Sequence, residues 1–282
     1  MIKKTLALML LIALPLVAAA ADRALIVGIG QYADPAWARI NGDNDLNYVR
    51  RMLLEAGYSD IRTLSNQNAT KDAIVREFRA LAQRCRPGDK VYFHFSGHGQ
   101  LITDLDGDEA IRRSDNSGWE QSLVPYDAYM NYCAADRGEK HISDDELAQL
   151  LACVRSSIGS DGQLVAVIDA CHSGDATMAD DEPETVRGVD VRFTIPRSTV
   201  QSSQAASPDR REQWLTVSAC RPHQLCTEIK GKSVGKLTYV LYTVGLDRIL
   251  MLKPENMERR LADELSAYRG RLPQTPMVSG SK

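Results

Sequence analysis

An α/β fold with a mostly parallel central sheet and helices on both faces is predicted for this 282-residue chain. Three observations predict it: apolar runs of strand length recur along the chain, amphipathic helical stripes separate them, and glycine or proline marks many of the turns between them. Strands that alternate with helices pair in parallel, because each helix carries the chain back across the sheet.

The expected strands are short, largely apolar runs that cover 24–29, 61–64, 90–95, 163–169 and 214–218. The expected helices carry apolar residues every three or four positions and cover 45–56, 70–84, 143–155, 237–246 and 255–268. Gly57 ends the first of these helices, and Thr70 caps the second. Ser143-Asp144-Asp145-Glu146 is a capping box that begins the third.

The composition is that of an ordinary globular protein, with 44% hydrophobic and 25% charged residues. Disordered, collagen-like and coiled-coil classes are therefore excluded. The 34 basic and 37 acidic side chains give a formal net charge of −3, and no run of Lys or Arg occurs. A nucleic-acid partner is therefore not expected.

Residues 1–21 have the three parts of a signal peptide. Lys3 and Lys4 precede an apolar run, and the small residues of 18–21 follow it, as at a cleavage site. The apolar run is shorter than the roughly 20 residues of a membrane span, although an uncut anchor helix is the alternative. We therefore expect a protein exported to the periplasm or the extracellular space, without membrane contact after cleavage.

Residues 22–282 are then expected to form one domain with two insertions. The stretch near 101–140 is acidic and rich in turn residues, and the stretch near 175–211 lacks apolar periodicity. Loops of this length are usually functional or disordered. The expected strands continue on both sides of each stretch, which argues against a domain boundary. The sequence does not indicate an oligomeric state.

Two of the expected strands end in groups that can react. One runs into Ser96-Gly97-His98-Gly99, and another runs into Asp169-Ala-Cys171-His-Ser-Gly174. Sites in open α/β sheets lie at the carboxyl ends of the strands, so His98 and Cys171 form a candidate base and nucleophile. The flanking glycines allow backbone amides to approach a substrate carbonyl, as an oxyanion hole requires.

The remaining cysteines and histidines leave several alternatives open. His172 could replace His98 as the base, whereas His94 lies within a strand and is interpreted as a core residue. Export would allow disulfides, and with one reactive thiol at most two could form, but spacing assigns no pairing and buried free thiols are equally expected. No Cys and His pair has the spacing of a zinc site. The cysteines are Cys85, Cys133, Cys153, Cys171, Cys220 and Cys226.

The two motifs resemble those of metacaspases and bacterial caspase-like cysteine peptidases of clan CD. Tyr92-Phe-His-Phe-Ser-Gly-His-Gly-Gln100 is similar to the histidine motif of this family, and Ile168-Asp-Ala-Cys-His-Ser-Gly174 is similar to its cysteine motif. Weaker likenesses extend over the mature chain, at 24–32, 44–45, 218–224, 235–238 and 274–276. The resemblance implies a caspase-like three-layer sandwich and an endopeptidase that acts on peptides or proteins.

By this resemblance, His98 is the general base and Cys171 the nucleophile, and the amides of Gly99 and Cys171 form the oxyanion hole. The thiolate would attack a peptide carbonyl and form an acyl-enzyme, which water hydrolyses. A nearby imidazolium would lower the pKa of the thiol. A caspase-fold binding module that has lost its activity is the alternative function, and the intact pair counts against it.

The resemblance also implies a substrate preference. Metacaspases line the pocket for the residue before the cut with acidic groups, and they cleave after Arg or Lys. Asp45 and Asp169 match acidic positions of that pocket, and Ser96 matches a polar one. Gly42 departs from the Cys that metacaspases often have there, and Arg39 lies about where a caspase carries the arginine that selects Asp. Cleavage after Asp is therefore the alternative, in which Asp45 would only complement a helix dipole.

Calcium is the one cofactor that the resemblance suggests, because metacaspases often use aspartates to bind an activating calcium ion. Asp144 and Asp145 resemble part of that set, although the capping box explains the same pair without a metal. The run 104–109 alternates carboxylates but fails the EF-hand pattern. The run 28–33 fits a loose dinucleotide fingerprint, but Asp34-Pro35 interrupts the helix that should follow.

The insertion near 175–211 follows the candidate nucleophile directly and is expected to be a self-cleavage linker. Polar, mobile loops are the usual sites of proteolysis, because a protease needs an extended and accessible backbone. A surface insertion that the enzyme never cuts is the alternative. The basic cut sites that the insertion offers are Arg187, Arg197, Arg210 and Arg211.

Overall fold

The computed structural model describes residues 21–105, 107, 118–172, 184–196, 213–268, 270 and 273–281. A six-stranded sheet forms its centre, in the order β2-β1-β3-β7-β8-β9. All neighbouring strands are parallel except β9, which is antiparallel to β8 at the edge. The strands are β1 (Asp22–Gly28), β2 (Asp60–Ser65), β3 (Lys90–Ser96), β7 (Gln163–Asp169), β8 (Leu215–Ser218) and β9 (Met277–Gly280).

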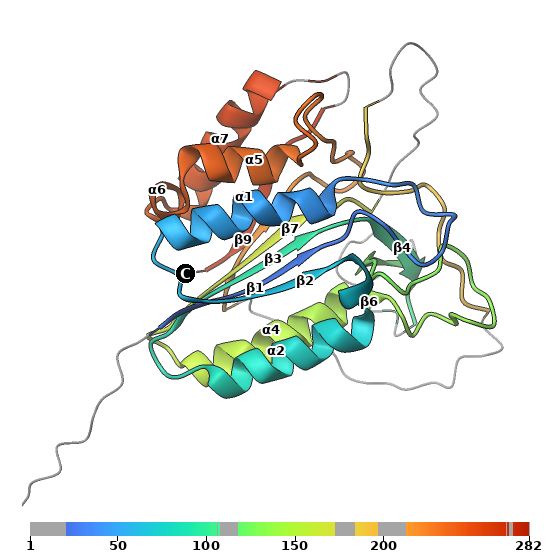
Figure 1. Cartoon of the computed structure of the whole chain (residues 1–282), viewed down its shortest axis with the longest axis horizontal. Helices are drawn as coiled ribbons and strands as arrows, with labels where there is room; N and C mark the ends of the chain where they lie inside the picture. Colours follow the sequence, from blue (N-terminus) through green and yellow to red (C-terminus); the bar gives the residue numbers. More distant parts are fainter. Residues whose placement is uncertain are drawn as a thin grey trace, which may run out of the picture.

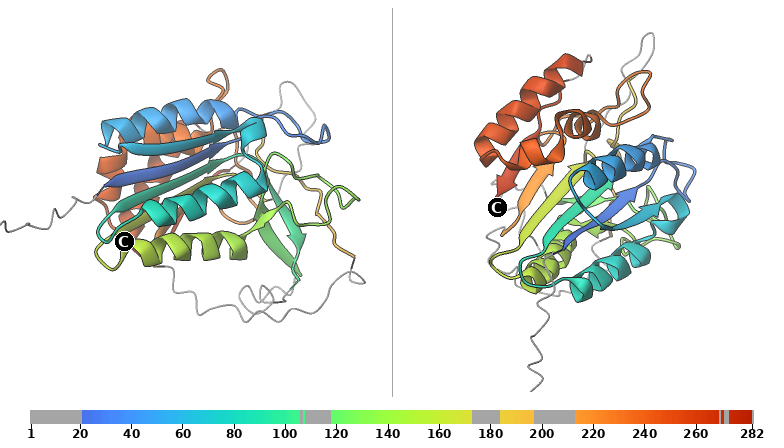
Figure 2. Two further views of the ribbon diagram at one scale, coloured as in Figure 1. Left: turned by 60° about the horizontal axis from the view of Figure 1, so that its bottom comes forward. Right: turned by 60° about the vertical axis from the view of Figure 1, so that its left-hand side comes forward.

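Helices cover both faces of this sheet, so the protein has three layers (Figures 1 and 2). One face carries α1 (Gly42–Glu55), α5 (Lys236–Val244), α6 (Leu246–Leu250) and α7 (Pro254–Leu265). The other face carries α2 (Lys71–Arg84) and α4 (Asp144–Ile158). Each face has its own apolar core cluster, because alternate residues of the strands point to opposite sides. The predicted α/β class with its mostly parallel sheet is confirmed.

Local signals in the sequence account for most element boundaries. The Thr70 hydroxyl accepts a hydrogen bond from the Ala73 amide at 3.3 Å and caps α2. Ser143 does the same for the Glu146 amide at 3.2 Å, at the start of α4. The first helix begins at Gly42 rather than near Asp45, because the Asn41 carbonyl already accepts the amides of the following turn.

A second, three-stranded sheet was not predicted from the sequence. It has the order β4-β5-β6 and lies beyond the end of the central sheet at which the parallel strands terminate (Figure 2). Its strands are β4 (Gly99–Thr103), β5 (Trp119–Leu123) and β6 (Ile142–Ser143). The stretch near 101–140 therefore contains regular structure. Its strands are short and partly polar, so the sequence shows no long apolar run that would predict them.

The expected signal peptide lies almost wholly outside the described residues, which begin at Ala21. Within the described part of the chain, no helix is long and apolar enough to cross a membrane.

The sheet register has one consequence for function. It places Gly28, Ser96 and Asp169 side by side at the carboxyl ends of β1, β3 and β7.

Replacing Asp89 with asparagine is expected to destabilise the fold at neutral pH. The Asp89 carboxylate accepts hydrogen bonds from Arg23 Nε at 2.8 Å and from the Arg86 amide at 3.0 Å. Burial raises the pKa of Asp89, but these bonds and that from the Ala21 amide outweigh it and hold the pKa below its usual value. A carboxyl with a lowered folded pKa stabilises the fold above its unfolded pKa, and this contribution is lost as the pH falls.

Urea unfolding from pH 7 to pH 3 tests this prediction. At pH 7 the free energy of unfolding of the Asp89→Asn variant should be lower than that of the wild type by about 1–3 kcal/mol. The difference should shrink below about pH 4, where the carboxyl takes up a proton in the unfolded chain. A difference that does not change with pH would show that the charge of Asp89 does not contribute.

Candidate active site

The chain places His98 immediately after β3, in a clamp that fixes its ring. Trp37 stacks on the imidazole at a centroid distance of 5.3 Å, and the Tyr32 hydroxyl accepts a hydrogen bond from the His98 amide at 2.7 Å. The Nε2 atom donates to the Ala38 carbonyl at 2.9 Å, which leaves Nδ1 as the unprotonated nitrogen. Among the described residues, the buried Nδ1 has no hydrogen-bond partner. Burial lowers the pKa of His98 and favours this neutral form.

Cys171 follows β7 and is 1% exposed. The thiols of Cys220 and Cys226 contact it, and their hydrogen bonds hold the pKa of Cys171 below its usual value although burial opposes this. The negative charge of the Cys171 thiolate counteracts the fall in the pKa of His98. The two sequence-predicted residues therefore lie close enough to interact.

A segment of the chain itself, residues 184–196, passes through this site and forms isolated β-bridges with its neighbours. The carbonyl oxygen of Arg187 accepts a hydrogen bond from the Cys171 amide at 3.1 Å and another from the Gly99 amide at 3.3 Å. The Arg187 amide donates to the Cys226 carbonyl at 2.9 Å. The carbonyl carbon of Arg187 is thus the peptide carbon that the two candidate oxyanion-hole amides present to Cys171.

The side chain of Arg187 is fully buried among three carboxylates. Its guanidinium lies 2.5 Å from Asp45 Oδ2, 3.1 Å from Glu228 Oε1 and 3.6 Å from Asp169 Oδ1. A second bond to Asp45, at 3.1 Å, makes that contact bidentate. The planar fork of a guanidinium suits such carboxylate contacts, and the three acids form a pocket that the Arg187 side chain fills.

The walls of the pocket hold these acids in place. Thr238 donates to Asp169 Oδ2 from its amide at 2.9 Å and from its hydroxyl at 2.6 Å. The Gly235 amide donates to Asp45 Oδ1 at 3.1 Å. A Cβ atom at Gly235 would lie 2.3 Å from Asp169 Oδ2 and 2.5 Å from Arg187 Nη1, so only glycine leaves room for the guanidinium.

Beyond Arg187, the segment runs parallel to β4. Gly188 pairs with Gly99, and the Phe193 amide donates to the Leu101 carbonyl at 2.8 Å. The Phe193 ring is fully buried beside Ile102 and Ile195. Backbone bridges therefore hold the chain on both sides of the Arg187–Gly188 bond, at Val186 before it and at Gly188 and Phe193 after it.

The structure brings most of the sequence-predicted site residues together. The amides of Cys171 and Gly99 bind the Arg187 carbonyl, Asp45 and Asp169 lie around its side chain, and His98 interacts electrostatically with Cys171. Ser96 contacts an acid of the pocket, because its hydroxyl donates a hydrogen bond to Asp45 Oδ2 at 2.7 Å. Arg39 is exposed and makes none of the pocket contacts described for Arg187.

The structure gives the environments of Arg187, His94 and His172, for which the sequence made specific predictions. The expectation that Arg187 lies in an accessible, mobile loop is wrong, because its side chain is buried by the three acids; Arg197, Arg210 and Arg211 lie outside the described residues. His94 is a core residue that contacts the Ser96 hydroxyl at 3.0 Å. His172 lines a neighbouring pocket.

Sequence reasoning missed Glu228. It lies in the loop after β8, where no periodic pattern marks it, and it binds both Arg187 and the Asn41 amide, the latter at 2.7 Å. An acidic residue shortly after the carboxyl end of a central strand was the available signal.

Carboxylates of Glu120, Asp144 and Asp145 form a separate cluster, in which one oxygen of each lies within 4.8 Å of the others. Burial, together with the charges of Asp144 and Asp145, raises the pKa of Glu120 to about 9. Asp144 Oδ1 is buried, and the described residues offer it no hydrogen bond. Oxygen ligands crowded in this way fit a hard cation such as calcium.

Comparison with known families matches residues 21–281 to the caspase domain. Metacaspase-1 of Eremothecium gossypii is 32% identical over 163 residues, which are 55% of this chain and 32% of that protein. Metacaspase-1 of Coccidioides immitis is 30% identical over 162 residues, or 55% of this chain and 31% of that protein. The matched region thus spans about a third of the length of these relatives.

Solved structures share the fold at lower identity. Caspase-1 of Spodoptera frugiperda aligns with a TM-score of 0.57 and 10% identity, covering 93% of this chain and 86% of that one. A Geobacter sulfurreducens protein aligns with a TM-score of 0.62 and 19% identity, covering 93% and 94%. The chain belongs to the caspase domain family of cysteine-type endopeptidases, and the predicted caspase-like fold and family are confirmed.

Proposed function

We propose that this protein is an exported cysteine endopeptidase that cleaves after Arg or Lys with a Cys171–His98 dyad. One observation supports the proposal: the Arg187 side chain lies among acids and its carbonyl accepts hydrogen bonds from two amides, as expected of a substrate residue. The segment 1–21 supports export, because it has the charged, apolar and small-residue parts of a signal peptide.

The reaction follows from the position of each group. The Cys171 sulfur attacks the carbonyl carbon of the residue in the acidic pocket, and the thiol proton passes to His98 Nδ1. The amides of Gly99 and Cys171 stabilise the negative oxygen. His98 returns its proton to the leaving nitrogen as the peptide bond breaks, and a water molecule then hydrolyses the acyl-enzyme. The Ala38 carbonyl accepts the hydrogen bond from His98 Nε2–H throughout the reaction, so Nδ1 is the nitrogen that takes up and releases the transferred proton.

The pocket selects a cation because its acids repel one another when it is empty. Burial raises the pKa of Asp169, and Asp45 adds to this although Arg187 counteracts it. Removing one partner from a buried ion pair leaves an uncompensated charge, which costs about 3–5 kcal/mol. A neutral or acidic side chain in this pocket therefore binds far less well than Arg or Lys.

Four fluorogenic peptides that differ only in the residue before the cut test this specificity. The value of kcat/KM should be highest for Arg, lower for Lys, and about 10²–10³-fold lower for Gln and Asp. The Gly235→Ala variant should lose most of the Arg cleavage, because its methyl group occupies the guanidinium site. Faster cleavage after Asp would favour the alternative in which Arg39 governs the pocket, and no cleavage at all would favour the non-catalytic binding module.

We propose that Glu120, Asp144 and Asp145 bind a calcium ion, because their carboxylate oxygens lie close together. Calcium would neutralise the repulsion among the three carboxylates, and no step of the reaction needs it. At about 100 times its Kd, calcium should stabilise the inactive Cys171→Ala protein by about 2.7 kcal/mol. Thermal unfolding measures this, and the Glu120→Gln variant should lose the stabilisation. Equal calcium effects in both proteins would place the ion elsewhere.

A further inference from the structure

Two cysteines that the proposed mechanism does not require lie in contact next to the nucleophile. Cys220 Sγ and Cys226 Sγ are 2.7 Å apart, on the loop that follows β8. Cys220 Sγ also lies 3.3 Å from the Gln224 carbonyl oxygen, and Cys226 Sγ lies 3.2 Å from the Ala170 carbonyl oxygen. All six cysteines of the chain lie in the described residues, and none of them forms a disulfide there.

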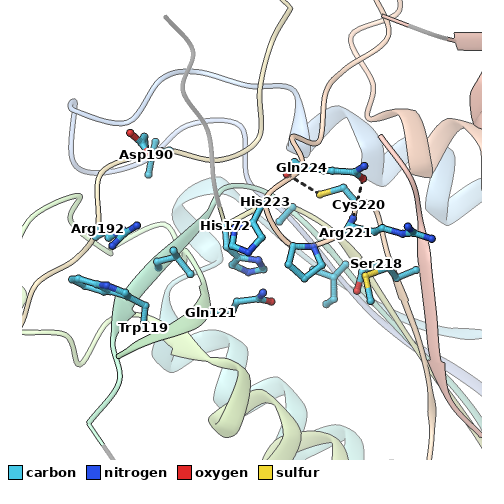
Figure 3. A pocket seen from close by; sticks show the side chains of 16 residues that line it. Trp119, Gln121, His172, Asp190, Arg192, Ser218, Cys220, Arg221, His223 and Gln224 are labelled. Atoms are coloured by element: carbon cyan, nitrogen blue, oxygen red, sulfur yellow. Dashed lines mark hydrogen bonds between the residues drawn. The ribbon is translucent and has the colours of Figure 1, made fainter. Parts of the chain in front are cut away.

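The two thiols differ in their access to solvent. Cys226 is fully buried, whereas Cys220 is partly exposed and lines a pocket of about 420 Å³ (Figure 3). Small molecules therefore reach the pair through Cys220. Basic side chains line the pocket and suit a ligand that carries carboxylates, although the Asp190 carboxylate also lies there. The basic residues are Arg192, Arg221, His172 and His223.

We propose that Cys220 and Cys226 form a reversible redox site that switches the peptidase, with a small carboxylate-bearing disulfide such as oxidised glutathione as its oxidant. Cys220 attacks one sulfur of oxidised glutathione, which expels one glutathione thiol and forms a mixed disulfide. Cys226 then attacks the Cys220 sulfur, expels the second glutathione thiol and forms the Cys220–Cys226 disulfide. Two protein thiols are thereby oxidised, one glutathione disulfide is reduced, and the two protons leave on the glutathione thiols.

The disulfide would act on the nucleophile and on substrate binding together. It removes both S–H donors that stabilise the Cys171 thiolate, so the pKa of Cys171 rises. It also constrains Cys226, whose carbonyl accepts the Arg187 amide at 2.9 Å, only two residues before Glu228 of the arginine pocket. The reduced pair is therefore the active form.

Glutathione redox buffers of increasing oxidised fraction test the switch on the purified, self-processed enzyme. Peptide mapping by mass should find the Cys220–Cys226 link as the buffer becomes oxidising, and kcat/KM for the Arg peptide should fall about tenfold or more in parallel. Dithiothreitol should restore both. The Cys226→Ser variant should stop at a glutathione adduct on Cys220, and the Cys220→Ser variant should take up no glutathione in this loop. Cys153→Ser, which removes an exposed thiol on α4, should behave as the wild type does.

Two results would overturn the proposal. One is a mapped disulfide that joins Cys171 to either partner while Cys220 and Cys226 remain unlinked to each other. The other is equal inactivation of the wild type and the Cys220→Ser variant at the same redox potential. The effect on turnover depends on the proposed peptidase function, but mass mapping detects the disulfide without any activity. An inactive enzyme that still forms the link would therefore contradict only the proposed function.

Discussion

The Cys171→Ala and His98→Ala variants are expected to lose activity against Arg peptides by about 10⁴-fold or more. Alanine at 171 removes the atom that would attack the carbonyl, and alanine at 98 removes the group proposed to carry its proton. Residues that act as one unit in a cysteine or serine hydrolase show effects of this size when either is removed. Initial rates at several enzyme concentrations measure the loss.

Controls separate this loss from misfolding and from contamination. The circular dichroism spectra of both variants should match that of the wild type, which would show that the fold survives the loss of the His98 contacts with Trp37 and the Ala38 carbonyl. Cys153→Ser provides a matched loss of one thiol and should keep full activity. Turnover at the wild-type rate by either Cys171→Ala or His98→Ala would reject the dyad.

The second large effect is expected at Arg187. Lysine at this position should still be cleaved, because a single cation satisfies the three acids, whereas Arg187→Gln should slow self-cleavage by about 10²–10³-fold. The glutamine leaves Asp45, Asp169 and Glu228 without their cation. Time courses of the full-length and cleaved chains on denaturing gels give the rates.

A second arginine of the same segment provides the control. Arg192 is exposed and stacks on the Trp119 ring at 5.1 Å. The Arg192→Gln variant therefore removes an equal charge without changing the acidic pocket around Arg187. It should be processed at close to the wild-type rate. If Arg187→Gln and Arg192→Gln are processed equally fast, Arg187 is not the residue that the pocket recognises.

The sequence predicted the edge of the fold at which the candidate active site lies, because position along a strand determines position in space. Parallel strands end at one edge, so any reactive groups that follow them meet there. His98 and Cys171 follow adjacent strands, and Asp169 ends one of them. Asp45 was predicted from the family resemblance, because it matches an acidic pocket position at the start of the first helix. These inferences needed only the strand pattern and the family resemblance.

The features that were missed depend on contacts between distant parts of the chain. Arg187 meets Asp45 across 142 positions and Glu228 across 41, and no local pattern in 175–211 announces either contact. Polar composition therefore suggested a mobile loop where the chain is buried in its own site. Likewise, β4 and β5 are both short and partly polar, so neither forms the long apolar run that predicts a strand.

The position of the self-cleavage site tests the central claim most directly. Intact-mass analysis over time, followed by mapping of the new termini, should show a break between Arg187 and Gly188 in the wild type and no break in Cys171→Ala. Cleavage after Arg197, Arg210 or Arg211 with the Arg187–Gly188 bond intact would contradict the claim that Arg187 occupies the substrate pocket. Equal cleavage of both proteins would assign the cut to another protease.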